Sequence, residues 1–227
     1  EINSNYKDVR SLMNKAHNLG TDYVFVSMKN QTQQVIPRRL EADLLNFDTY
    51  GINDFWTLYH SRKDKNINYD FYLQVNLKSI QVSPEQIKET SSIKEREIED
   101  IYYQKDAQGN FIKDADGNKI QVIEKIMVRS NFNQIRQFKS SKVVGQVKYI
   151  DNNSKQVLHV YPIESEFIFE HTYARYTGDK RALSSRFLKY SRLRLVQFPS
   201  NEQMIYDTGK DLKNRLKSII TRNKFRQ

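Results

Sequence analysis

The sequence predicts an α+β fold in which helices pack on a long-stranded sheet that is mixed or mostly antiparallel. Three observations lead to this class. The chain of 227 residues has seven Gly and four Pro but 12% aromatic residues, a balance that favours long regular elements. Apolar residues recur at every second position in the middle of the chain and at helical spacing near its end. With 38% hydrophobic residues, the chain can build a sizeable core.

Residues 1–20 predict a terminal helix that ends at Gly20. The phrase NYKDV resembles the start of the closing helix of a tetratricopeptide-type array, which implies helical repeats before residue 1. The alternative is a helix that packs on the domain's own sheet. We expect residues 21–227 to form a single α+β domain. The apolar face of the helix has three- and four-residue spacing: Tyr6, Val9, Leu12, Met13 and Ala16.

The next elements alternate strand and helix. Residues 23–28 form a short β-branched and aromatic run, which predicts a buried strand. Pro37 stands where a first helical residue is expected, and the helix that follows has an apolar face made by Leu40, Leu44, Leu45 and Phe47. A second short helix is expected over residues 52–60, with Phe55, Trp56 and Tyr59 buried.

A long strand is predicted from residue 69, because the apolar period there is two. The alternation slips near Ser79, which predicts a β-bulge. After Ser83 and Pro84, the charged residues 85–99 predict a loop or a weakly anchored helix. Further strand signals follow as far as residue 173, so residues 84–142 are predicted to be a β-meander insert. One face of the first strand is apolar: Phe71, Leu73, Val75, Leu77, Ile80 and Val82.

A turn phrase occurs twice within the insert, as Asp-Ala-Gln-Gly-Asn at residues 106–110 and Asp-Ala-Asp-Gly-Asn at 114–118. A calcium-binding EF-hand loop needs Gly at position 6 and Glu at position 12, whereas here Gly117 is at position 4 and Lys125 at position 12. Asp and Gly are also common turn residues. We therefore interpret the phrase as two reverse turns, joined by residues 111–113 as a short middle strand.

The C-terminal segment predicts a long helix that lies on the sheet. Ser200 is a suitable N-cap, and Gln203 completes a capping box. The apolar stripe of the helix is continuous: Met204, Ile205, Thr208, Leu212, Leu216, Ile219 and Ile220.

The net charge of +10 is concentrated in the second half of the chain, where residues 101–227 hold 24 Lys and Arg but 12 Asp and Glu. Such an excess attracts anionic partners, whether acidic lipid headgroups, anionic polymers, acidic proteins or nucleic acid. A nucleic acid would stack its bases on Phe187 and Tyr190, which are interleaved with the basic residues. Residues 192–195 also fit an edge strand with basic decoration. The candidate residues for an anionic partner are Arg186, Lys189, Arg192, Arg194, Lys210, Lys213, Lys217 and Arg222.

Several kinds of chemistry find no support in the sequence. The absence of Cys excludes disulfides, a thiolate nucleophile and a sulfur-based zinc site. The four His residues are not at metal-ligand spacing, and neither phosphate-binding glycine motif is present. Glu164 and Glu166 share a strand face, which a solvated acidic row explains better than acid/base catalysis. We expect no cofactor, no metal and no enzymatic activity.

The order of elements resembles the envelope lipoprotein superfamily of the curli secretion pore and the penicillin-binding-protein activators. The resemblance rests on YVFVSMKNQT, RLEADLLN, GQVKYIDNNSKQVL and the capped final helix, and covers about residues 21–60 and 143–222. It implies a periplasmic protein of a Gram-negative envelope, tethered to the outer membrane by a lipidated Cys upstream of residue 1. The Asn-, Lys- and Tyr-rich composition is typical of Bacteroidota.

The sequence therefore predicts a protein that binds other envelope components. The expected role is an accessory subunit of an outer-membrane secretion or assembly machine, or a regulator of peptidoglycan synthesis. Docking would use aromatic anchors and the basic C-terminal face. The main alternative is a nucleic-acid-binding module on that basic face, although no recognisable nucleic-acid-binding motif supports it. A glycan hydrolase and a pore-forming subunit are further alternatives.

Overall fold

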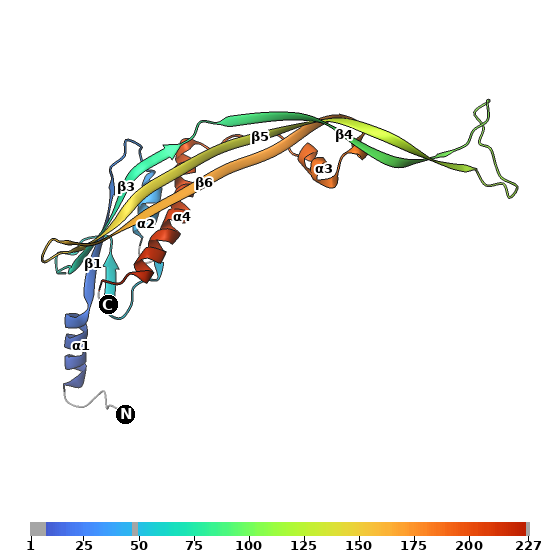
Figure 1. The fold of residues 1–227 in the computed structure, drawn as a ribbon. Coiled ribbons are helices and arrows are strands. Elements are labelled where there is room, and N and C mark those ends of the chain that lie inside the picture. Colours follow the sequence, from blue (N-terminus) through green and yellow to red (C-terminus); the bar gives the residue numbers. More distant parts are fainter. Residues whose placement is uncertain (1–7, 47–49, 226–227) are drawn as a thin grey trace. The chain divides into compact units, whose positions relative to one another are not determined.

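The structure is a computed structural model that describes residues 8–46 and 50–225. It confirms the α+β class, because the described residues form a mixed six-stranded sheet and four α-helices, the last of them long. The elements follow in this order (Figure 1): α1 Val9–Gly20, β1 Asp22–Asn30, α2 Arg38–Leu45, β2 Thr57–His60, β3 Phe71–Val82, β4 Gln86–Tyr103, β5 Gln121–Asp151, β6 Val157–Gly178, the 3-10 helix η2 Lys180–Ala182, α3 Ser185–Arg192 and α4 Asn201–Arg222.

The chain divides into two compact units, and each is described by itself. Unit 1 comprises the residues up to Pro84, residues 139–169, and those from Pro199 onward. Unit 2 comprises residues 85–138 and 170–198. Strands β5 and β6 contribute residues to both units. The predicted domain boundary after residue 20 stays a prediction.

Unit 1 contains the mixed part of the sheet, in the order β2-β1-β3-β5, with β6 paired to β5. Strand β1 is parallel to both β2 and β3, whereas β3 is antiparallel to β5. The β5–β6 turn closes with a bond from the Asp151 N–H to the Gln156 carbonyl (2.9 Å). The strand predicted at residues 23–28 is confirmed as β1.

The bulge predicted near Ser79 is confirmed. The register of β3 against β5 shifts between Leu77, which pairs with Gly145, and Ser79, which pairs with Val144. Five of the six apolar residues predicted for one face of β3 are buried, and Val82 is half-buried. The extra residue in β3 keeps this face directed into the core on both sides of the bulge.

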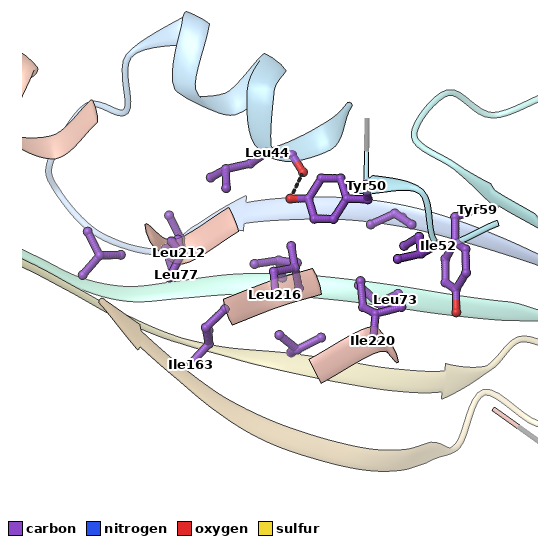
Figure 2. Packing of buried hydrophobic residues seen from close by; sticks show 14 of the residues in the cluster. Leu44, Tyr50, Ile52, Tyr59, Leu73, Leu77, Ile163, Leu212, Leu216 and Ile220 are labelled. Atoms are coloured by element: carbon purple, nitrogen blue, oxygen red, sulfur yellow. Dashed lines mark hydrogen bonds between the residues drawn. The ribbon is translucent and has the colours of Figure 1, made fainter. Parts of the chain in front are cut away.

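Helices α2 and α4 complete the core of unit 1. Figure 2 shows Leu212, Leu216 and Ile220 of α4 over the strands that carry Leu73, Leu77 and Ile163. On the α2 side, the Tyr50 hydroxyl donates to the Leu44 carbonyl (3.0 Å), and burial raises the pKa of Tyr50. At Gly209 in α4, a Cβ would lie 2.1 Å from Leu40 Cδ1, so glycine allows the two helices to approach.

Buried hydroxyl groups fix α4 on the sheet. Ser141 of β5 donates to the Met204 carbonyl (3.0 Å), and its hydroxyl also contacts that of Thr208. From β6, Ser165 contacts the Thr208 carbonyl (2.9 Å) and the Asp211 carboxylate (2.8 Å). The predicted helix and its stripe are confirmed, with Ile219 half-buried and the other six residues buried. Because buried polar groups are costly without partners, these bonds also set the axial position of the helix.

The predicted N-cap of α4 is confirmed, since the Ser200 side chain accepts from the Gln203 N–H at 3.1 Å. The Gln203 side chain bonds to Asp207 (2.8 Å), so it does not close the reciprocal half of the capping box.

Replacing Ser200 with alanine is expected to lower the free energy of unfolding by about 1 kcal/mol, because the first turn loses a partner for a backbone N–H. Urea denaturation followed by circular dichroism measures the change. Ser200→Asp serves as the control, since aspartate also caps helices, and it should keep nearly the wild-type stability. An equal loss in both variants would contradict the capping role.

The second short helix predicted over residues 52–60 is wrong. Residues 57–60 form β2, which pairs with β1 through partners such as Val24 and Tyr59. Tyr59 is buried as predicted, but Phe55 is 65% and Trp56 50% exposed. The tertiary pairing with β1 overrides the local helical spacing of the aromatic residues.

Two smaller expectations about the N-terminal region also change. Pro37 is the N-cap of α2 and not its first helical residue as predicted, since the helix begins one position later at Arg38. The predicted face residue Phe47 lies outside the described residues. Helix α1 is confirmed, but it buries no side chain, and Leu12 and Met13 are 55% and 61% exposed. Tyr6, predicted for the same face, lies outside the described residues.

Unit 2 contains β4, residues 121–138 of β5 and residues 170–178 of β6. The prediction of a charged loop or weak helix at residues 85–99 is wrong, because this segment belongs to the 18-residue strand β4. Its pairs with β5 have a constant register from Gln86 and Phe138 to Tyr103 and Gln121. Backbone pairing along β5 therefore forms the strand without an apolar face of its own.

A small second core lies on one face of unit 2. Phe132, Ala174 and Leu183 are buried together, and Phe187 of α3 packs on Phe132 with ring centroids 4.7 Å apart. After Gly178 the chain forms η2 and then α3. The Ser184 side chain caps α3 by accepting from the Phe187 N–H.

Candidate functional site

The eight basic residues predicted to bind an anionic partner do not all belong to one unit. Arg186, Lys189 and Arg192 lie on α3, and Arg194 follows in a segment without regular structure, so these four belong to unit 2. The other four lie on α4, in unit 1. The structure therefore describes two groups of four.

The α4 group is mixed with acidic residues. Lys210 bonds to Asp207 (2.9 Å), which raises the pKa of the lysine. Lys213 lies 5.0 Å from the centre of the Tyr50 ring. One turn further on, Arg215 pairs with Asp211 (2.6 Å) and lowers the pKa of that carboxyl group. Lys217 and Arg222 are exposed. This face presents alternating charges, which weakens its attraction for a polyanion.

The α3 group is less suited to base stacking than predicted. Phe187 is not a free stacking ring, because it packs on Phe132 in the second core. The Tyr190 hydroxyl accepts from Arg186 at 3.3 Å. The edge strand predicted at residues 192–195 is also wrong, since Arg192 ends α3. Instead, the buried Gln137 amide bonds both backbone groups of Val196, at 2.8 and 3.2 Å.

The most exposed region of unit 2 is the ribbon, which we define as β4, the tip at residues 104–120 and the first residues of β5, up to Met127. None of its side chains, from residue 86 to residue 127, is buried. The hydrophobic cores accordingly contain no buried residue from it. This ribbon is held by backbone pairing and surface contacts, and its odd-numbered side chains are all exposed.

One face of the ribbon alternates apolar side chains and ion pairs. Paired residues in the constant β4–β5 register share a face, so the odd-numbered residues lie together. Glu95 pairs with Arg129 (2.7 Å) and Glu97 with Lys125 (3.4 Å) on this face. Between and beside these pairs lie large apolar side chains that are 55–62% exposed: Ile87, Ile93, Ile101, Ile123 and Met127.

The ribbon tip is built from the eight-residue sequence repeat. The Gln104 N–H donates to the Ile120 carbonyl, the Ile112 N–H to the Gln104 carbonyl and the Ile120 N–H to the Ile112 carbonyl, at 2.9, 3.0 and 3.0 Å. These three residues are eight positions apart in sequence, and each donates to one of the others and accepts from the third, so the three bonds form a closed ring. The expected middle strand at residues 111–113 is reduced to isolated bridges, Lys105 with Phe111 and Lys113 with Lys119.

Both repeats fold as the predicted reverse turns. Asp106 Oδ1 accepts from the N–H groups of Gln108 and Asn110, and Asp114 Oδ1 accepts from the equivalent pair in the second repeat. The bond from the Asn110 N–H is the main cause of a lowered pKa at Asp106. Gly109 and Gly117 have φ of 87° and 84°, a conformation that favours glycine. The repeated phrase is therefore confirmed as a turn motif.

Aromatic and basic side chains meet at the tip. Lys119 Nζ lies 4.0 Å from the centre of the Phe111 ring and 5.6 Å from that of Tyr103. Lys105 Nζ belongs to the same cluster and lies 5.0 Å from the centre of the Phe111 ring. Contacts of this kind stabilise an exposed turn by roughly 0.5–1 kcal/mol each. They also present two aromatic rings to solvent.

The remaining polar residues show no grouping typical of a metal site. In the described ranges, no three or more His, Asp and Glu side chains lie close enough to hold a metal ion. His17 and His171 bond to backbone carbonyls, and His60 bonds to the Tyr69 hydroxyl (3.1 Å). Glu164, one of the paired carboxylates considered above, forms an ion pair with Lys142 at 3.1 Å.

Comparisons with known proteins place the chain in no established family. No family model matches the sequence, and no curated protein matches it. A solved structure that is similar to this chain is that of a neuraminyllactose-binding hemagglutinin homolog from Helicobacter pylori. The match has 11% identity, a TM-score of 0.39, and covers 89% of this chain and 84% of that chain. At this TM-score the likeness carries no argument about fold or function. None of the helices in the described part of the chain is both long and apolar enough to span a membrane.

Proposed function

We propose that this protein is a non-enzymatic docking subunit that binds a partner protein through the ribbon of unit 2. The observation that carries the proposal is the complete lack of burial from residue 86 to residue 127. Ordering a residue costs roughly 1–2 kcal/mol of backbone entropy, and this segment recovers none of that cost by filling a core. Binding of a partner protein would bury part of this ordered surface and so explain why the segment is exposed in the free protein.

The chemistry of the ribbon supports protein docking over small-molecule binding. Its odd-numbered face offers Ile93, Ile101 and Met127 as apolar contacts between ion pairs that remain half exposed. Exposed apolar groups rimmed by polar residues are typical of protein interfaces. At the tip, Tyr103 and Phe111 add the aromatic side chains that are enriched among interface residues.

The proposed setting is the bacterial envelope. It follows from the resemblance to the curli-secretion-pore and penicillin-binding-protein-activator superfamily, not from the comparisons. In that setting the protein would be a periplasmic lipoprotein, tethered through a Cys upstream of residue 1. It would act as an accessory subunit of an outer-membrane secretion or assembly machine, or as a regulator of cell-wall synthesis.

A ribbon-shortened variant tests the docking function. Residues 97–127 are replaced with Asn-Gly, which joins the paired residues Arg96 and Val128 by a two-residue hairpin turn. Because the removed residues include no buried side chain, both cores should persist. Full-length protein purified from its native membranes should hold an envelope protein in stoichiometric amount, identified by mass spectrometry. The amount of this partner that co-purifies with the shortened variant should be lower by tenfold or more.

The matched control changes the basic residues of α3 and leaves the ribbon intact. The triple variant Arg186→Gln, Lys189→Gln and Arg192→Gln should retain the partner. Loss of the partner from this control, with retention by the shortened variant, would contradict docking through the ribbon. Nucleic acid in the wild-type preparation, lost with the basic residues and with rising salt, would instead support the nucleic-acid alternative.

A further inference from the structure

The outer edge of β4 has no strand beside it among the described residues, because β4 pairs only with β5. The strand is 18 residues long and contains neither proline nor a register shift. A long edge of this kind presents a row of backbone donors and acceptors to solvent. It is the geometry that an extended peptide uses when it adds to a sheet.

The hydrogen-bond pattern shows which backbone groups point outward. The Gln104 N–H donates to the Ile120 carbonyl, so even-numbered residues of β4 bond to even-numbered residues of β5. On the other side of β5, the Arg129 carbonyl accepts from the Asp179 N–H, so the odd-numbered groups of β5 face β6. The outward groups of β4 therefore belong to Ile87, Glu89, Ser91, Ile93, Glu95, Glu97, Glu99, Ile101 and Tyr103.

The odd-numbered side chains share one face of the ribbon, where every second side chain of an added strand would lie beside them. Three carboxylates, Glu95, Glu97 and Glu99, lie between the apolar Ile93 and Ile101. Glu95 and Glu97 stay 46% and 57% exposed beside their cations on β5. Opposite charges on neighbouring strands stabilise a sheet, and apolar pairs do the same. The complementary strand has Lys or Arg opposite the carboxylates and apolar residues opposite the two isoleucines.

A second copy of this chain does not meet that requirement through β4 itself. In antiparallel self-pairing, registers centred on residues 95 to 98 place carboxylates of Glu95, Glu97 or Glu99 from the two copies directly opposite each other. Like charges in that position destabilise a sheet. This face therefore disfavours pairing with its own copy and favours a partner of opposite charge.

We propose that the outer edge of β4 binds an extended segment of a partner protein as an added strand, with basic residues beside the three carboxylates and apolar residues beside the two isoleucines. This inference rests on the proposed docking function and specifies its chemistry. Backbone bonds to the odd-numbered residues supply affinity, and the carboxylates select the basic segment.

The test uses the full chain and two short labelled synthetic peptides, which have Thr at every second position and Val opposite Ile93 and Ile101. At the three positions opposite the carboxylates, one peptide has Lys and the other has Glu. Fluorescence anisotropy should show binding of the Lys peptide and weaker binding of the Glu peptide. The double variant Ser91→Pro and Glu97→Pro removes two outward N–H groups without breaking a β4–β5 bond. Against the control Ser91→Ala and Glu97→Ala, it should bind the Lys peptide about tenfold more weakly.

Charge reversal keeps the test decisive if proline distorts the ribbon. The triple variant Glu95→Lys, Glu97→Lys and Glu99→Lys retains the backbone edge and should prefer the Glu peptide. Equal binding of both peptides by wild type, or unchanged preference in the triple variant, would overturn the proposal. Self-association of wild type that the proline variant abolishes would overturn it in favour of a second copy.

Partner capture separates this inference from the docking function on which it rests. If both the shortened and the proline variants lose the membrane partner while the alanine control keeps it, both proposals stand. If only the shortened variant loses the partner, docking stands and the added strand is wrong. If the shortened variant keeps the partner, the docking function itself fails.

Discussion

Replacing Leu216 with alanine is expected to lower the free energy of unfolding by about 3 kcal/mol. Leu216 lies within the α4 stripe, is 1% exposed and belongs to the core of unit 1 with Leu73 and Leu77 of β3 (Figure 2). Alanine favours a helix at least as strongly as leucine, so the loss reports the missing core contacts and the cavity. Urea denaturation followed by the helical circular dichroism signal measures it.

Leu195 provides the control, since it is 60% exposed and lies outside regular secondary structure. Leu195→Ala removes the same atoms from the surface and should change the stability by less than about 0.5 kcal/mol. A similar effect of the two substitutions, or a loss below about 1 kcal/mol for Leu216→Ala, would mean that α4 is not anchored as the structure describes.

Helix α4 and the β3 bulge were predictable because their determinants are local. The N-cap Ser200 and the apolar stripe of α4 lie within one continuous segment, so the helix and its buried face follow from spacing and capping alone. In β3, the even spacing of Phe71, Leu73, Val75 and Leu77 resumes at Ile80 after one extra residue. That single displacement is sufficient to indicate a bulge.

Strands β2 and β4 were not predicted, because their strand conformation depends on the strands with which they pair and not on a pattern in their own sequences. Strand β2 has four residues and forms beside β1, more than 30 positions earlier in the chain. Strand β4 buries no side chain on either face, so it lacks the apolar alternation by which strands are recognised. Its charges, such as Glu95 and Glu97, match basic residues across the ribbon.

The candidate site was predicted in part. Composition identified the basic residues, but residues near in sequence, such as Arg192 and Lys210, belong to different units. The sequence around the turn repeat also contains a signal for the ribbon. Apolar residues at equal distances from the centre of the repeat, Ile98 with Ile126 and Ile101 with Ile123, pair directly in the ribbon. Symmetry of this kind about a predicted turn indicates a long hairpin.

Gly145 is the position in β5 where a single added methyl group should matter most. A Cβ there would lie 2.6 Å from the Asn76 carbonyl oxygen and 3.3 Å from the Leu77 side chain, at the point where the β3 register shifts. The obstacle is backbone in a buried strand, since Asn76 is 2% exposed, and it cannot rotate away as a side chain would. The glycine therefore allows the two strands to approach at the bulge.

Gly145→Ala is expected to lower the free energy of unfolding by about 2–3 kcal/mol, because β3 and β5 must separate at the bulge. Alanine has the lower entropy cost in a strand, worth roughly 0.5–1 kcal/mol, so any net loss underestimates the clash. The half-buried neighbour Val144, changed to alanine, reports the lower strand propensity of alanine and a small loss of packing, and should cost less than about 1 kcal/mol. Urea denaturation of both variants measures these changes. A Gly145→Ala protein as stable as wild type would mean that the strands are not in close contact at the bulge.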